Sequence, residues 1–167
     1  MKDIGYIVIY ALVILWLTGC SNKFDSFDGT LSDGGKLNVA VDLSSVNTAI
    51  DIRNKRMQEM LFNVTKFAQA TFEANLPESM MNLKSGQVVN GKVDGILMLH
   101  GKAVPTSFAV KASKVNDDTL TVSTTSPTLI KAESFGLAEG VAALQKIAGL
   151  KSITTTVPVT FSVTFTQ

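Results

Sequence analysis

Two stretches of this sequence alternate between apolar and polar side chains, and this pattern constrains the fold more than any other feature. In residues 157–166 every odd position is Val or Phe, and every even position is Pro, Thr or Ser. In residues 88–100 the odd positions are all Val, Leu or Gly, while the even positions begin polar and end apolar. Successive side chains of a strand point to opposite faces of a sheet, so each stretch predicts a strand with one continuous apolar face.

Shorter segments with strand-like composition lie between turn signals such as Asp28-Gly29 and Asn116-Asp117-Asp118. The further strands predicted on this basis are 37–43, 70–75, 104–114, 119–126 and 128–133. Consecutive strands joined by turns indicate an antiparallel sheet that curls into a barrel or a sandwich.

Two segments have helical spacing instead, which predicts one or two short helices. In the first, residues 52–62, Met57, Met60 and Leu61 recur at helical spacing. These methionines fit either core packing or an adaptable lid over an apolar ligand. The second helix is expected over residues 137–148, with Gly149 ending it.

The N-terminus carries an apolar run, residues 4–17, that follows Lys2 and leads to the single cysteine, Cys20. A charged start, a short apolar core and small residues at its end are typical of a secretory signal peptide. The run is shorter than the roughly 20 residues of a membrane-spanning helix. An uncleaved membrane anchor and a buried structural cysteine in a cytosolic protein are the alternatives left open.

Residues 17–20, Leu-Thr-Gly-Cys, resemble a bacterial lipobox, in which the cysteine is acylated and the preceding segment is removed. The resemblance implies a lipoprotein signal peptide over residues 1–19, lipidation of Cys20, and contact with a membrane through the acylated Cys20. A tether over 20–26 would then lead into one domain over 27–167. Ser21, in place of Asp, favours the outer membrane over the inner membrane of an exported, periplasmic lipoprotein.

Composition argues against several classes of function. The formal net charge is +1 and only 17% of residues are charged, so there is no basic excess that would indicate nucleic-acid binding.

The only histidine, His100, ends a predicted strand and is expected to be a bystander, so no metal site is predicted. Asp117-Asp118 are expected to form a turn, and no catalytic residues are predicted. Arg53, Lys55 and Arg56 fit a solvated helix face or contacts with an anionic headgroup at a cavity mouth.

Several segments, in order, resemble the YceI-like family. They are residues 42–48 (DLSSVNT), 52–57 (IRNKRM), 61–62 (LF), 67–72 (FAQATF), 93–101 (VDGILMLHG), 104–110, 134–137 (SFGL) and 157–165. The resemblance spans residues 27–166. It implies a lipocalin-like antiparallel β-barrel that binds a long apolar molecule, such as a polyisoprenoid, an isoprenoid quinone or a fatty amide, and a link to stress. No counterpart of the family's opening hairpin is found between Cys20 and Phe24, so six to eight strands are expected. A barrel open on one side, a narrower barrel and a barrel completed by a partner are the alternatives left open.

The candidate ligand-binding residues are the apolar side chains predicted to face the barrel interior. They are Val89, Val93, Leu97, Leu99, Phe108, Val110, Val159, Phe161, Val163 and Phe165. Gly91 and Gly95, on the same face, would leave room for a ligand. No cofactor is expected beyond a bound isoprenoid or fatty-acid-type lipid, and a homodimer is left open. The alternative is a structural or interaction module with a filled core, and an enzyme acting on lipids is disfavoured by the lack of a catalytic constellation.

Overall fold

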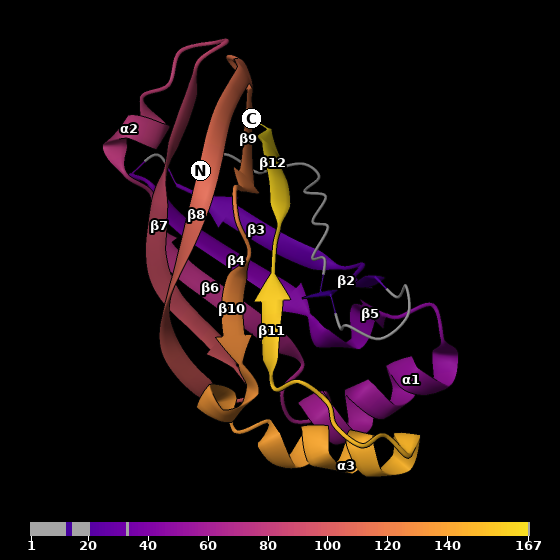
Figure 1. Ribbon diagram of the computed structural model, residues 1–167. Coiled ribbons are helices and arrows are strands. Elements are labelled where there is room, and N and C mark those ends of the chain that lie inside the picture. Colours follow the sequence, from indigo (N-terminus) through magenta and orange to yellow (C-terminus); the bar gives the residue numbers. More distant parts are fainter. Residues whose placement is uncertain (1–12, 15–20, 33, 167) are drawn as a thin grey trace.

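Seven antiparallel strands form the main sheet, in the order β12-β9-β8-β7-β6-β4-β3. The computed structural model describes residues 13–14, 21–32 and 34–166, and in it this sheet curls into a near-closed barrel (Figure 1). The strands are β3 (Phe27–Leu31), β4 (Lys36–Asp42), β6 (Gln69–Asn75), β7 (Val88–Leu99), β8 (Lys102–Asn116), β9 (Thr119–Thr124) and β12 (Ser162–Thr166). The predicted fold class, a mainly β antiparallel barrel with few helices, is confirmed.

The longest hairpin joins β7 to β8 through the two residues His100 and Gly101. Both have positive φ, 51° and 73°, and the flanking residues Leu99 and Lys102 are paired. A two-residue turn with positive φ at both positions matches the natural twist of the strands, which explains how such long strands reverse so tightly.

The two edges of the main sheet approach each other through a short additional sheet. Its strands are β1 (Val13–Ile14), β2 (Ser21–Phe24) and β5 (Val46–Asn47), with β2 in the middle. β1 also contacts β11 (Thr156–Val159), which precedes β12 in the chain. From the sequence we expected no hairpin at the start of the barrel. The structure corrects this expectation, because Val13 pairs with Asn22 and Ile14 pairs with Ser21.

This pairing bears on two predicted segments. β2 lies within the segment that we expected to be a tether. β1 lies within the segment expected to be a signal peptide, and the rest of that segment, together with Cys20, is outside the described residues.

The two predicted helices are present. α1 (Asp51–Arg56) continues directly into the π-helix η2 (Met57–Phe62), which ends at Asn63 with φ of 50°. α3 (Ala138–Ala148) ends at Gly149 with φ of 64°, as the glycine predicts. Within the described residues, no helix is long and apolar enough to cross a membrane.

The structure adds three short helices that the sequence patterns did not predict: η1 (Leu43–Ser45), α2 (Glu78–Met81) and η3 (Ala132–Phe135). η3 takes the last residues of the predicted strand 128–133, so β10 is shorter, Thr128–Lys131. The strand predicted over 157–166 is divided at Thr160 and Phe161 into β11 and β12. β11 pairs with β10, and β12 pairs with β9.

Candidate ligand-binding site

All ten predicted site residues belong to the apolar interior of the barrel, but they differ in how much surface they leave open. Five are buried in the largest core cluster: Val93, Phe108, Val110, Val163 and Phe165. Val89, Val159 and Phe161 pack against that cluster and are half-buried, and Leu97 and Leu99 pack in the same way against the cluster around Phe135. Only the half-buried side chains have surface that a ligand can contact without displacing the core.

The exposure of the interior changes along the barrel. Toward α2, the interior is closed by Met80, which is 1% exposed. Toward α3, the inward positions on β7, β8, β10 and β11 become half-buried. A packed half and a more open half therefore share one continuous apolar lining.

Three phenylalanines cross the interior between these halves. The Phe108 ring lies edge-on to Phe72, with centroids 5.1 Å apart, and edge-on to Phe161, with centroids 5.2 Å apart. Phe108 is buried, whereas Phe72 and Phe161 are half-buried. Edge-to-face pairs at these separations are the favoured geometry for aromatic rings, so the row forms a fixed floor for the open half.

The two interior glycines of β7 do not leave empty space, which corrects our expectation. A Cβ at Gly91 would lie 2.7 Å from Cε of Met80. A Cβ at Gly95 would lie 2.6 Å from Cζ of Phe72 and would also meet the Glu73 carbonyl oxygen. The space beside each glycine is therefore filled by a neighbouring side chain of this chain.

Several lining residues were missed by sequence reasoning. Phe72, Val104 and Ile130 are half-buried apolar residues on the same interior, as are Leu61 from η2 and Val141 from α3. The alternation of Ala70, Phe72 and Ala74 carried the signal for Phe72. The contributions of the two helices depend on how they fold back over the barrel, which local pattern does not encode.

His100 has a structural partner on each side. Its Nδ1 lies 3.3 Å from the Phe135 carbonyl oxygen, and its ring lies 4.4 Å from the ring of Phe67, centroid to centroid. It therefore joins the β7–β8 turn to η3 and to the segment after η2. Among the described residues, no group of three or more His, Cys, Asp or Glu side chains is placed to hold a metal ion.

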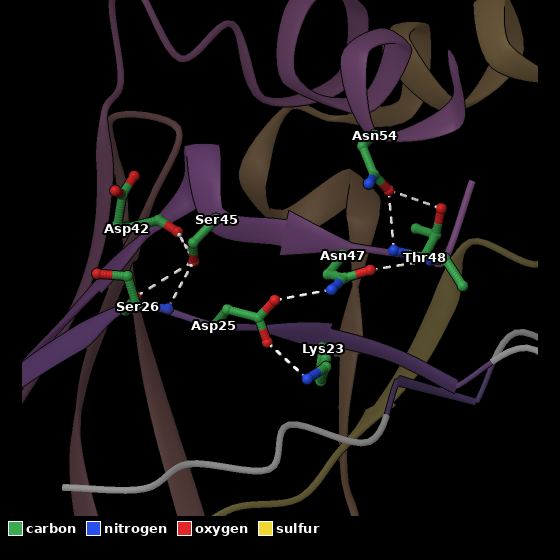
Figure 2. A network of polar contacts seen from close by, with 9 residues as sticks. Lys23, Asp25, Ser26, Asp42, Ser45, Asn47, Thr48 and Asn54 are labelled. Atoms are coloured by element: carbon green, nitrogen blue, oxygen red, sulfur yellow. Dashed lines mark hydrogen bonds and ion pairs between the residues drawn. The ribbon is translucent and has the colours of Figure 1, made fainter. Parts of the chain in front are cut away.

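A network of polar contacts fixes the strand β2 to the segment that leads into α1 (Figure 2). Thr48 is fully buried, and its backbone N–H and hydroxyl both donate to Oδ1 of Asn54, at 2.8 and 2.7 Å. The Ser45 hydroxyl donates to the Asp42 carbonyl at 2.6 Å and accepts from the Ser26 N–H at 3.0 Å. A buried hydroxyl with such a partner holds a defined geometry, and here Thr48 orients α1 through Asn54 at the end of the barrel.

The same network holds one carboxylate in its charged form. Lys23 Nζ lies 2.7 Å from Oδ1 of Asp25, and Asn47 Nδ2 donates to Oδ2 at 2.7 Å. The hydrogen bond from Lys23, followed by that from Asn47, lowers the pKa of Asp25 below its ordinary value. The pair is exposed to solvent, so it orients the strands more than it stabilises them.

Comparisons with known proteins agree with this geometry. The model of the YceI-like domain matches residues 9–165, and this match begins within the predicted signal peptide. No curated protein matches the sequence.

Solved structures resemble the chain over nearly its whole length. A polyisoprenoid-binding domain from Saccharophagus degradans, implicated in plant cell wall breakdown, is 29% identical, with a TM-score of 0.88 and coverage of 96% of this chain and 93% of that one. BcnA of Burkholderia cenocepacia is 18% identical, with a TM-score of 0.69 and 95% of both chains covered. The YCEI protein of Campylobacter jejuni is 17% identical, with a TM-score of 0.63 and coverage of 99% and 93%. The family match, the barrel topology and these structural likenesses lead to one conclusion: the chain belongs to the YceI-like family.

Proposed function

We propose that this protein is a membrane-anchored binding protein that holds a long apolar ligand in the open half of its barrel. The observation that carries the proposal is the row of half-buried apolar side chains that continues from Phe72 and Phe161 to Leu97 and Val104. The 29% identical relative is a polyisoprenoid-binding domain, which favours a polyisoprenoid over an isoprenoid quinone or a fatty amide.

The driving force would be the removal of apolar surface from water, at roughly 25 cal/mol per Å². A prenyl chain has little polar surface to desolvate, so the lining can bind it without many hydrogen bonds. An apolar lining that binds its ligand through area burial fits a carrier or sequestering role.

We place the protein outside the cytoplasmic membrane, held by an acylated Cys20, with the outer membrane favoured by Ser21. An anchor would keep the barrel beside the bilayer that supplies its ligand. The pairing of Val13 and Ile14 with β2 supports the competing idea that this segment stays attached. Mass spectrometry of the protein from its native membrane distinguishes the two: a first residue of Cys20 carrying acyl chains supports the anchor, and an intact N-terminus contradicts it.

The ligand is tested by gentle purification, lipid extraction and mass spectrometry, followed by uptake of a long-chain polyprenol by the purified protein. A stoichiometric apolar species, or saturable uptake of polyprenol, is the expected result. Absence of both would overturn the binding role.

A filled structural module is the second candidate. It is favoured by the filling of the Gly91 and Gly95 positions by Met80 and Phe72. A barrel that takes up no apolar probe but forms a stable complex with a second copy or another protein would support it.

A further inference from the structure

The end of the barrel that carries α1 and α3 exposes four large aliphatic side chains. Ile50 and Ile52, at the start of α1, are 40% and 54% exposed, and Ile147 and Leu150, at the end of α3, are 46% and 38% exposed. η2, which continues α1, and α3 each supply an apolar residue to the barrel: Leu61 and Val141 pack on the cluster around Phe135. The four aliphatic residues are thus outside the ligand lining and need a separate explanation.

Contacts between distant segments bring these residues to one end of the molecule. A Cβ at Gly140, early in α3, would lie 2.7 Å from the Met60 carbonyl oxygen in η2, so the two helical segments touch closely. The start of α1 and the end of α3 then lie on the same side of the barrel end (Figure 1). The contacts of His100 with Phe67 and Phe135 add the β7–β8 turn to this end, which we call the helical end: residues 50–66, 100–102 and 131–151.

Charge is distributed unevenly between the helical end and the rest of the chain. The helical end contains eight Lys and Arg residues and four Asp and Glu residues, a net charge of +4. The rest of the sequence contains seven and ten, a net charge of −3. A nearly neutral protein is therefore strongly polarised, with its positive charge on the end that exposes the isoleucines.

The positive charges are mostly available to a partner. Lys55, Lys146 and Lys151 are exposed. Within the described part of the helical end, the one ion pair is between Lys55 Nζ and Glu59 Oε1, at 4.0 Å and with both side chains more than 60% exposed. An exposed pair at that distance contributes little, and it leaves the lysine free to interact elsewhere.

We propose that the helical end docks on the surface of an anionic phospholipid bilayer. Exposed isoleucines insert among the headgroups, and the surrounding lysines and arginines are attracted to the negative surface; both features together characterise interfacial binding. A soluble protein partner would explain the exposed aliphatic side chains or the positive charge, but each on its own. A bilayer surface explains both together, because it accepts a diffuse positive charge around separated aliphatic side chains. The proposal does not depend on ligand binding in the barrel.

The orientation also agrees with a tether near residue 20. β2 begins at Ser21 and pairs with β5, and the chain passes from β5 to α1 within a few residues. A membrane attachment just before β2 would therefore hold the helical end, and not the α2 end, close to the bilayer.

The test places an environment-sensitive NBD label on the full chain, with Cys20→Ser in every variant so that the label has one site. One variant carries Ile52→Cys, and its matched control carries Val115→Cys, which is 57% exposed on β8 and lies outside the helical end. Vesicles of phosphatidylcholine with and without 30% phosphatidylglycerol are titrated at low salt and at 0.5 M salt. The emission of the label at residue 52 should shift to the blue with anionic vesicles only, and this shift should be lost in high salt. The emission of the label at residue 115 should not change under any of these conditions.

Attachment through the N-terminal segment alone would affect both labels equally, so an equal response would overturn the proposal, as would no response at residue 52. A second comparison measures how much the lysines of the helical end contribute to vesicle binding. Lys55→Gln, Lys146→Gln and Lys151→Gln together should raise the lipid concentration at half-response more than tenfold, since each surface cation contributes about fivefold. Lys84→Gln, Lys111→Gln and Lys114→Gln, outside the helical end, should change it less than about twofold. Equal effects of the two triple variants would contradict docking by this end.

Discussion

The methyl group of Met80 occupies the place where a side chain at residue 91 would begin. A Cβ built on Gly91 would lie only 2.7 Å from Met80 Cε, and Met80 itself is 1% exposed. α2 thus seals one end of the barrel by inserting a flexible side chain against a glycine of the longest hairpin.

This relationship predicts coupling between the two positions. Met80→Ala should lower the free energy of unfolding by about 2–5 kcal/mol, because it leaves a cavity in the core. Gly91→Ala should cost about 1 kcal/mol alone, since the Met80 methyl group must move. In the Met80→Ala background, Gly91→Ala should become neutral or stabilising, because alanine restricts the unfolded chain and its methyl group has space. Urea denaturation of the four proteins measures the cycle, and additive effects would show that the two residues do not interact.

Gly95 should tolerate alanine much less well than Gly91. A Cβ at residue 95 would meet Phe72 at 2.6 Å, Ala74 Cβ at 2.8 Å and the Glu73 carbonyl oxygen. Because the carbonyl belongs to the paired strand β6, the clash is relieved only by moving backbone, and we expect a loss of about 3 kcal/mol in the free energy of unfolding. Gly91→Ala, on the same face of the same strand, is the control. An equal loss at the two positions would contradict the close approach of β6 to Gly95.

The strands could be predicted from the sequence because alternation is a local property. β7 and the 157–166 segment were recognised from their alternation, and most turn residues located other strands to within a few positions. Asp28-Gly29, expected as a turn, lies instead inside β3, because the pairing of Phe27–Leu31 with β4 overrides the local turn preference. The family resemblance added the closure of the sheet into a barrel, which the residue pattern alone left open against a sandwich.

The rest of the interior depends on contacts between residues far apart in the sequence. Gly91 and Gly95 resemble gaps when only their own strand is considered, but Met80 from α2 and Phe72 from β6 fill them. α2 is four residues long and has no periodicity to detect. The pairing of Val13 with Asn22 was missed because the apolar N-terminal run has the composition of a signal peptide, and composition does not distinguish it from a strand.

The ligand proposal predicts opposite outcomes for two neighbouring residues of β7. Leu97 faces the interior and is half-buried, whereas Ile96 faces outward and is 43% exposed. Leu97→Ser should weaken polyprenol binding by about tenfold, since it removes roughly 1–2 kcal/mol of apolar contact. Ile96→Ser should leave the affinity within about twofold. Fluorescence competition with a bound apolar probe measures both, and thermal melts of the two variants establish that each is folded at the assay temperature. Equal weakening would place the ligand outside the barrel.

The contacts of Asp25 predict a small dependence of stability on acid. Its pKa is lowered in the folded protein by the hydrogen bonds from Lys23 and Asn47, so the unfolded chain takes up a proton more readily. The stabilisation is therefore complete above the unfolded pKa of about 3.9 and is lost as the pH falls toward the folded pKa. Because the group is exposed, it should amount to no more than about 1 kcal/mol. Wild type should be more stable than Asp25→Asn at pH 6, and the difference should decrease by pH 3.

Thermal melts across that range measure the difference. If Asp25→Asn remained less stable than wild type by the same amount at pH 3 and pH 6, the carboxylate charge would not be the cause.

His100 combines a constrained backbone with two side-chain contacts, and substitutions can separate these contributions. Its φ of 51° lies in the left-handed region, where alanine is strained and glycine is not. Both His100→Ala and His100→Gly remove the contact with the Phe135 carbonyl and the packing on Phe67. The glycine variant should therefore be the more stable of the two by about 1 kcal/mol, although glycine loses more conformational entropy on folding than alanine does. At Lys102, whose φ is not positive, the same pair of substitutions should give the reverse order, with alanine more stable. Chemical denaturation measures all four variants, and the same order at both positions would show that the turn does not hold His100 in its left-handed conformation.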